Sequence, residues 1–196
     1  MTRPTVAEIN LSAIRKNLKK IKSLSKGSLI YPVVKANAYG HGYKEVIKEI
    51  ENLVNGLSVA TTEEALEIRK ITNKSILCME GPYDQKELDL LIKNKIDLVI
   101  HSKRQIEFIE PNDRFPKETK VWIKVDTGMN RLGFKEEEII DAYKQLQAKT
   151  KKIVLMSHFS SAAGTKSSKI NSKKQIDSFN KICLLYTSPS PRDGSE

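Results

Sequence analysis

Short apolar runs rich in β-branched residues alternate along the chain with longer segments in which apolar residues recur at helical spacing. The short runs predict strands over residues 6–10, 29–36, 57–60, 75–79, 97–100, 120–125 and 153–158. The longer segments predict helices over residues 11–24, 43–53, 62–71, 85–94, 103–109, 136–147 and 169–182. The helix over 62–71 also has a start signal, because Thr61 or Thr62 stands at its beginning with Glu64 or Glu67 following.

Apolar strands that are each followed by a helix are typical of a parallel sheet covered by helices. From Leu29 onward the chain offers about six such units, whereas a closed TIM-type barrel needs eight. The pattern predicts an α/β fold, and one form that six units allow is a (β/α)8-type barrel that is incomplete. A doubly wound sheet is also compatible with six units, and the count alone does not choose between the two.

Residues 184–196 differ from the rest of the chain in pattern and in composition. They abandon the strand–helix alternation and the lysine-rich character together, and they are rich in serine and proline, which is typical of a disordered tail. The segment also resembles the translated read-through of a sequencing adaptor. We therefore interpret residues 1–183 as one partial barrel domain and 184–196 as a non-native tail, so that the chain is a fragment. Exposed sheet edges then predict poor solubility or no stable fold.

The composition is that of an ordinary soluble protein, with 30% charged and 39% apolar residues. No apolar run approaches the roughly 20 residues that span a bilayer, and the N-terminus lacks the apolar core of a signal peptide. We expect a cytoplasmic protein with no membrane partner. Cys78 and Cys183 are too few for a disulfide framework and are predicted to be small core residues.

The net charge of +10 raises the alternative of a basic nucleic-acid-binding protein. The lysines are dispersed over the polar faces of predicted helices, as in residues 15–22, where Leu18 and Ile21 keep the apolar spacing. No nucleic-acid-binding motif accompanies them. We expect a solvated basic surface that attracts an anionic cofactor and no nucleic-acid partner.

Lys35 directly follows the apolar run at residues 30–34. In a barrel, functional side chains sit at the carboxyl ends of the strands. Partial desolvation there lowers the pKa of an amine, and a neutral amine is what Schiff-base chemistry requires. The alternative is a lysine that reaches past the strand end into solvent.

The ten residues 33–42, VVKANAYGHG, resemble the pyridoxal-phosphate attachment motif of the alanine racemases. Related barrel families carry shorter and different lysine motifs, so the stretch from Ala36 to Gly42 favours the racemases over them. The resemblance implies that Lys35 holds pyridoxal phosphate as a Schiff base and that Tyr39 helps to bind its phosphate. The alternative for Tyr39 is a packed loop tyrosine.

Residues 122–134, WIKVDTGMNRLGF, resemble a second racemase motif, again at a strand end. Arg131 would bind the substrate carboxylate, because its planar guanidinium accepts a carboxylate bidentately. Gly128 and Gly133 would allow a tight backbone path. Lys124 matches a lysine that the family commonly carries as a carbamate, whose negative charge would orient Arg131. The alternative for Lys124 is an ordinary barrel lysine with a neighbouring acid.

Residues 156–162, MSHFSSA, resemble the family segment whose histidine stacks against the pyridine ring, which assigns His158 to the cofactor. Taken alone, a histidine after an apolar strand is more often a structural residue, and the Lys35 and Arg131 motifs are what favour the cofactor role for His158. His41 and His101 are predicted to be loop or helix-cap residues. No set of histidines and carboxylates has metal-ligand spacing, so no metal is expected.

The resemblance implies an enzyme that interconverts L-alanine and D-alanine, supplying D-alanine for peptidoglycan, with a base on each face of the substrate. Lys35 would be one base. In the family the other is a tyrosine from a C-terminal β-domain, contributed by the second subunit of a homodimer. That domain is missing here, and Tyr186 is not assigned to this role, so we expect the fragment to be inactive. A racemase for serine or lysine and a non-catalytic pyridoxal-phosphate carrier are the alternatives.

Overall fold

The structure, a computed structural model, describes residues 5–25, 27–110 and 115–187. These residues fall into two compact units. The first comprises residues up to 80 together with 89–97, and the second comprises 81–88 and the residues from 98 onward.

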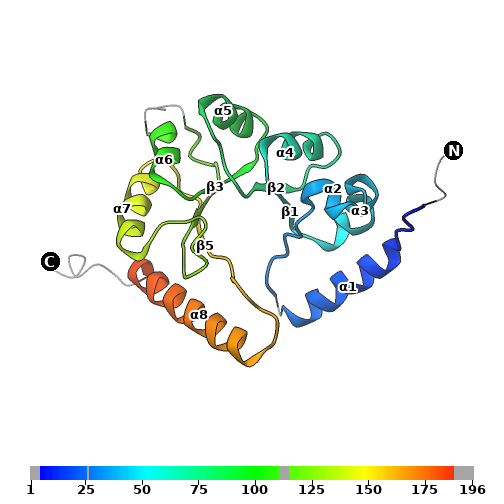
Figure 1. Cartoon of the computed structure of the whole chain (residues 1–196). Coiled ribbons are helices and arrows are strands. Elements are labelled where there is room, and N and C mark those ends of the chain that lie inside the picture. Colours follow the sequence, from blue (N-terminus) through cyan, green and yellow to red (C-terminus); the bar gives the residue numbers. More distant parts are fainter. Residues whose placement is uncertain (1–4, 26, 111–114, 188–196) are drawn as a thin grey trace. The chain divides into compact units, whose positions relative to one another are not determined.

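The first unit contains two parallel strands preceded by a group of helices, coloured blue to cyan in Figure 1. Strand β1 pairs with β2 so that Gly56 lies opposite Ser75 and Val59 opposite Cys78. All four residues of β1 are buried, as expected for a strand covered on both faces. The elements of this unit are α1 (Leu11–Leu24), α2 (Lys35–Tyr39), α3 (Tyr43–Ile50), the 3-10 turn η1 (Glu51–Leu53), β1 (Gly56–Val59), α4 (Thr62–Arg69) and β2 (Ser75–Cys78).

The second unit contains three parallel strands, and each is followed by a helix. Strand β4 pairs with β3 on one side and with β5 on the other, and Val121 lies opposite both Leu98 and Ile153. Helix α5 (Gln85–Lys93) has its first four residues in this unit and the remainder in the first. The other elements are β3 (Asp97–Ile100), α6 (Lys103–Ile109), β4 (Val121–Lys124), α7 (Glu136–Gln147), β5 (Ile153–Met156) and α8 (Lys166–Thr187).

The helix starts follow the capping rules that the sequence indicates. Asn10 Oδ1 accepts a hydrogen bond from the Ala13 backbone N–H at 2.9 Å and so caps α1. Thr61 caps α4, and Glu64 completes a capping box with it. The predicted start of α4 is therefore confirmed.

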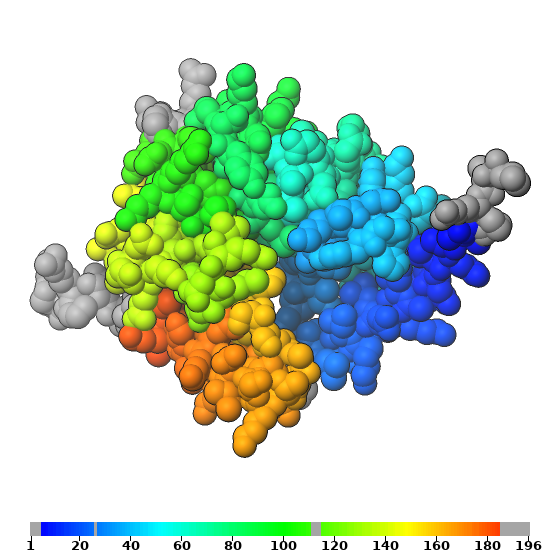
Figure 2. Space-filling view, viewed as in Figure 1, coloured from blue at the N-terminus to red at the C-terminus, as the bar shows by residue number. Residues whose placement is uncertain are grey.

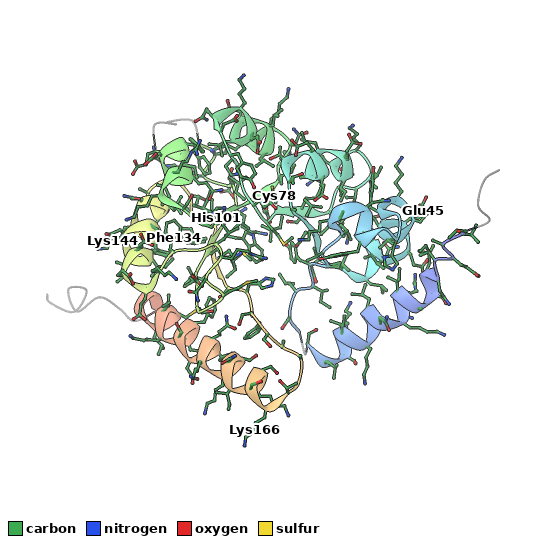
Figure 3. The ribbon with its side chains drawn as sticks, viewed as in Figure 1. Glu45, Cys78, His101, Phe134, Lys144 and Lys166 are labelled. Atoms are coloured by element: carbon green, nitrogen blue, oxygen red, sulfur yellow. The ribbon has the colours of Figure 1, made fainter. Side chains whose placement is uncertain are left out.

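The core of the second unit lies between its strands and α7. Phe134 is 1% exposed and lies on the strand side of α7, whereas Lys144 projects from the outer side of that helix (Figure 3). Ile139 and Leu146 on α7 are fully buried, which is the apolar face that the helical spacing predicts. Helix α8 lies beside α7 on the surface of the unit (Figure 2), and Lys181 forms an ion pair with Glu136.

Two predicted strands are wrong. Residues 6–10 form no strand and are exposed. Within 29–36 only Val33 pairs, in a single parallel bridge to Ser58. Pro32 has no N–H to donate to a ladder, and the backbone leaves the extended conformation already at Val34, whose ψ is 21°. The described part of the chain therefore contains five regular strand–helix units, and the sixth predicted unit is reduced to this bridge.

Helix α8 is longer than predicted. It begins at Lys166 and continues through Thr187, so the first four residues of the predicted tail, 184–187, are helical. The remainder of that tail, residues 188–196, lies outside the described residues.

Candidate active site

Lys35 lies where the chain leaves its bridge to β1. The Val34 backbone N–H donates to the Ser58 carbonyl oxygen at 2.8 Å, and the Lys35 side chain that follows is half-buried. The next four residues, Ala36 to Tyr39, have φ values of 49°, 56°, 53° and 54°. None of them is glycine, and left-handed helical geometry costs L-residues about 1–2 kcal/mol each. Lys35 is therefore attached to a strained left-handed turn that other interactions must stabilise.

Backbone hydrogen bonds hold part of this turn. The Ala38 N–H donates to the Val34 oxygen at 2.9 Å, and the Gly40 N–H donates to the Ala36 oxygen at 3.0 Å. Gly40 and Gly42, with φ of 83° and 84°, carry the chain out of the turn at little cost, because glycine tolerates positive φ.

Three side chains hold the rest of the turn. Asn37 Oδ1 accepts from the Tyr43 N–H at 2.9 Å, and Glu64 Oε1 accepts from the Ala36 N–H at 2.6 Å. His41 Nδ1 lies 2.8 Å from the Ala38 oxygen. A carbonyl oxygen only accepts, so Nδ1 of His41 carries the proton in this contact.

These supporting roles were missed by the sequence analysis. His41 was expected to be a loop or cap residue, and Glu64 was expected only as a possible cap of its own helix. Asn37 offered a weak signal, because asparagine tolerates left-handed geometry and bonds to nearby backbone. The contact between Ala36 and Glu64 joins residues 28 positions apart, and no local pattern could indicate it.

Tyr39 is the last residue of the left-handed turn. Its side chain is 59% exposed, so it is not the packed loop tyrosine considered as an alternative. Lys35 and Tyr39 thus share one turn of the first unit.

Lys124 ends β4 in the second unit and is 7% exposed. Burial lowers the pKa of its amine, the nearby positive charge of Arg131 lowers it further, and Asp126 acts in the opposite direction. Lys124 and Arg131 therefore lie close enough for their charges to interact, whereas the Arg131 side chain itself is exposed.

The loop that carries Arg131 is closed by backbone pairing at its two ends. The Phe134 N–H donates to the Lys124 oxygen and the Asp126 N–H to the Phe134 oxygen, both at 2.9 Å. Gly133 has φ of 126°, and a Cβ there would lie 2.7 Å from the Asp126 nitrogen. Gly128 also has positive φ, at 125°. The tight backbone path predicted for both glycines is confirmed.

Asp126 organises the inside of this loop. Its Oδ1 accepts from the Gly128 N–H at 3.1 Å and the Asn130 N–H at 3.0 Å, and its Oδ2 accepts from Lys135 Nζ at 2.6 Å. Burial raises the pKa of this carboxyl, but the hydrogen bonds from Lys135, Asn130 and Gly128 outweigh it and bring the pKa to about 2. Asp126 is therefore a fixed anion at the base of the Arg131 loop.

His158 follows β5, the strand beside β4, and its side chain is exposed. Gln175 on α8 is 4% exposed and holds the His158 segment in place. Its Nε2 donates to the His158 oxygen at 3.0 Å and to Thr127 Oγ1 at 3.2 Å, while its Oε1 accepts from the Ser160 N–H at 3.0 Å.

A directed chain of hydroxyl groups continues from Gln175. Ser157 Oγ donates to the Val125 oxygen at 2.9 Å, so the 2.7 Å contact between the two hydroxyls is a donation from Thr127 to Ser157. This chain joins the ends of β4 and β5 to α8. It borders a cavity of about 300 Å³, lined by Thr127, Ser157, His158, Phe159, Gln175, Ile176, Phe179 and Asn180.

The predicted site residues fall into two groups, Lys35 with Tyr39 in the first unit and Lys124, Arg131 and His158 in the second. Among the described residues, no three histidine, cysteine or acidic side chains gather in a way that could hold a metal ion. Within the same residues, no helix is both long and apolar enough to cross a membrane.

Comparison with known proteins places this geometry in a family context. The sequence profile of the alanine racemase N-terminal domain matches residues 9–191. The alanine racemase of Shewanella sediminis is 38% identical over 180 residues, covering 90% of this chain and 49% of that protein. The alanine racemase of Coxiella burnetii is 39% identical, covering 83% of this chain and 45% of that protein.

Solved structures give the same result. The biosynthetic alanine racemase of Pseudomonas aeruginosa superposes with a TM-score of 0.83 at 34% identity, over 94% of this chain and 51% of that one. The alanine racemase of Clostridium difficile in complex with cycloserine superposes with a TM-score of 0.79 at 33% identity, over 93% of this chain and 51% of that one. The chain therefore spans about half the length of these relatives. The predicted fold class, part of a barrel domain, is confirmed.

Proposed function

The chain belongs to the family of the alanine racemase N-terminal domain, and on this basis we propose that it is the cofactor-anchoring part of a pyridoxal-phosphate-dependent racemase that interconverts L-alanine and D-alanine. The observation that carries the proposal is the placement of Lys35. Lys35 is half-buried and directly precedes a left-handed turn that the chain maintains at an energetic cost. Strain of this kind persists where the surrounding structure supports it, and it is concentrated at functional sites.

The residues around Lys35 fit pyridoxal phosphate. Lys35 is only half-buried, which leaves it open to an aldehyde in solution, and the exposed Tyr39 on the same turn carries a hydroxyl that can donate to a phosphate oxygen. Lys35 would anchor the cofactor, Tyr39 would donate to its phosphate, and the His158 ring would lie against its pyridine face. When bound, pyridoxal phosphate supplies an electron sink that stabilises negative charge at the substrate Cα.

Lys35 would also transfer the proton at the substrate Cα on one face, because an amine positioned within reach of that proton can serve as a general base. Arg131 would bind the substrate carboxylate through two parallel N–H donors. The substrate is therefore an α-amino acid, and alanine follows from the family. Serine and lysine remain the alternative substrates.

Lys124 would act on Arg131. Because burial and Arg131 lower its pKa, the amine of Lys124 loses its proton more readily than that of a surface lysine. We propose that this nitrogen adds to carbon dioxide, forming an N–C bond and releasing one proton, to give a carbamate. The product is an anion beside Arg131, so a repulsive pair becomes an attractive one that orients the guanidinium. A non-catalytic cofactor carrier is disfavoured, since it has no substrate carboxylate for Arg131 to bind.

The remaining parts of the proposal concern the full-length protein. We propose that it is a cytoplasmic homodimer and that a tyrosine of the partner subunit is the base on the opposite face of the substrate. D-alanine for peptidoglycan would be its product.

The test uses full-length protein with Lys35→Ala and, as a matched control, Lys44→Ala, which changes an exposed lysine on α3. Circular dichroism would follow interconversion of the alanine enantiomers, and borohydride reduction with peptide mass spectrometry would locate the bound cofactor. We expect Lys35→Ala to abolish both signals and Lys44→Ala to retain both. Racemisation, or a trapped cofactor, in the Lys35→Ala protein would overturn the proposal.

A further inference from the structure

The side chain of Glu64 joins two structures that the sequence keeps 28 residues apart. Its Oε1 accepts from the Ala36 N–H at 2.6 Å. Its Oε2 accepts from the Ala60 N–H at 2.9 Å and the Thr61 N–H at 3.4 Å. One carboxylate oxygen thus accepts a hydrogen bond from the left-handed turn after Lys35, and the other accepts hydrogen bonds at the beginning of α4.

The contact with Ala36 acts on the backbone of Lys35 itself. The Ala36 N–H belongs to the same planar peptide unit as the Lys35 carbonyl, so a hydrogen bond that holds this N–H also restrains the orientation of that plane. The peptide unit on the other side of Lys35 is held as well, because the Val34 oxygen accepts from the Ala38 N–H at 2.9 Å. When both flanking planes are held, the direction in which the side chain leaves Cα is fixed.

Glu64 is also the part of this support that is independent of the turn. The Val34–Ala38 bond, Asn37 and His41 all come from within residues 34–43 and form as the turn forms. Glu64 comes from α4, which follows the buried strand β1 and has its own capping box. Hydrogen bonds from backbone N–H groups to a carboxylate are shorter and stronger than neutral ones, and the 2.6 Å distance agrees with this.

We propose that Glu64 is a positioning residue for Lys35: its carboxylate holds the left-handed turn against the N-terminus of α4 and thereby sets where the Lys35 amine stands. The inference rests on the proposed function of Lys35 as cofactor anchor. A role limited to capping α4 is the competing explanation. The positioning role and the capping role involve different oxygens of Glu64, because Oε1 contacts the turn and Oε2 contacts the beginning of α4.

The experiment compares three substitutions in full-length protein. Glu64→Ala removes both contacts, and Glu64→Gln retains one carbonyl oxygen but loses the charge and places an NH2 group among N–H donors. Thr61→Ala removes the capping hydroxyl of α4 and leaves the contact between Glu64 and Ala36 intact. Glu67→Ala, which changes an exposed glutamate on the same helix, is the control for surface charge.

Two readouts that do not require turnover are measured on protein freed of cofactor. The first is the rate at which added pyridoxal phosphate becomes borohydride-trappable on Lys35. The second is the extent to which a small amine-reactive reagent labels Lys35, measured relative to Lys44 in the same sample. Thermal unfolding of each variant reports stability separately.

We expect Glu64→Ala to slow trapping about tenfold, in line with one charge-assisted hydrogen bond, and to raise Lys35 labelling toward that of Lys44. Glu64→Gln should fall between it and the wild type. Thr61→Ala should lower the melting temperature yet leave trapping and labelling within about twofold of the wild type, because it retains that bond.

Equal effects of Glu64→Ala and Thr61→Ala on trapping and labelling, or no effect of Glu64→Ala, would overturn the inference. If the Glu64→Ala protein does not fold, the same comparison of trapping and labelling is made between Glu64→Gln and Thr61→Ala. Failure of the wild type to trap cofactor on Lys35 would overturn the proposed function, and the labelling ratio would still decide whether Glu64 positions the amine.

Discussion

Lys135 Nζ lies 2.6 Å from Asp126 Oδ2, an ion pair in which the aspartate side chain is 4% exposed and the lysine side chain 48% exposed. The aspartate is thus the buried partner, and it also accepts the two backbone N–H groups of the Arg131 loop. The charge of Asp126 therefore contributes to the stability of the loop that carries the proposed substrate-binding arginine.

The pKa of Asp126 makes this contribution dependent on pH. Its folded pKa of about 2 is below the ordinary value of 3.8, so the stabilisation is present above about pH 3.8 and is lost as pH falls from there toward 2. The shift corresponds to about 2 kcal/mol. We expect Asp126→Asn to lower the free energy of unfolding by about that amount at pH 7 and by much less near pH 2.

Urea unfolding of full-length protein at both pH values measures the effect. Asp141→Asn, which changes an exposed aspartate on α7, is the matched control and should have little effect at either pH. A loss for Asp126→Asn that is the same at pH 7 and pH 2 would show that its charge is not the cause.

Gly133 provides a second prediction about this loop. A methyl group there meets the Asp126 nitrogen at 2.7 Å and the Val125 carbonyl carbon at 2.9 Å, and both are backbone atoms that cannot rotate away. We expect Gly133→Ala to destabilise the protein by about 2–4 kcal/mol. Gly164→Ala is the matched control, since Gly164 also has positive φ but its Cβ would meet nothing within 4 Å.

Gly164→Ala should therefore cost only the backbone strain, about 1 kcal/mol. Chemical denaturation of the two variants provides the comparison. Equal losses would mean that φ alone, and not the close approach of the two backbone segments, requires glycine at position 133.

Local sequence patterns were sufficient to predict helix boundaries where capping and burial agree with the apolar spacing. Helices α1 (Leu11–Leu24) and α7 (Glu136–Gln147) have the boundaries that the apolar spacing predicts. Helix α7 buries Ile139, Ala142 and Leu146 on one face, whereas α1 buries only Leu18 and is capped by the Asn10 side chain. The same alternation predicted the strand β4, whose end leads into the Arg131 loop, whereas Lys35 follows a single bridge in place of the predicted strand.

The same patterns did not predict the backbone conformation where contacts with distant segments of the chain support it. Ala36 to Tyr39 read as an ordinary continuation of a strand into a loop, because nothing in Ala-Asn-Ala-Tyr specifies positive φ at four consecutive residues. The first residue of that turn, Ala36, is hydrogen-bonded to Glu64, which belongs to another helix. The role of Gln175 likewise depends on residues 15 and 48 positions away.

Gln175 supplies a third prediction. Its side chain forms four hydrogen bonds to the segments at the ends of β4 and β5 and is 4% exposed. Gln175→Leu retains the approximate volume but leaves Thr127 and the His158 segment without these partners. We expect a loss of about 2–3 kcal/mol in the free energy of unfolding, together with weaker cofactor binding if His158 lies on the pyridine ring as proposed.

Gln145→Leu, on the exposed side of α7, is the matched control and should change neither quantity. Urea unfolding and titration with pyridoxal phosphate, monitored by absorbance, give the two measurements. Unchanged stability in Gln175→Leu would show that the bonds of Gln175 do not hold the His158 segment.

Lys124 gives the last prediction, which separates a modified lysine from an ordinary buried one. A neutral amine is needed for addition to carbon dioxide, and the pKa of Lys124 is lowered by burial and by Arg131. Full-length protein kept in ¹³C-bicarbonate at pH 8 should therefore show a carbamate carbonyl resonance that disappears on acidification. Lys124→Gln should abolish the resonance and weaken binding of the substrate carboxylate, because the anion beside Arg131 is lost. Lys144→Gln, at an exposed position, should do neither. A resonance that survives Lys124→Gln, or its absence in the wild type, would leave Lys124 as a buried cation that opposes Arg131, and the orientation of that arginine would then depend on Asp126 and the loop alone.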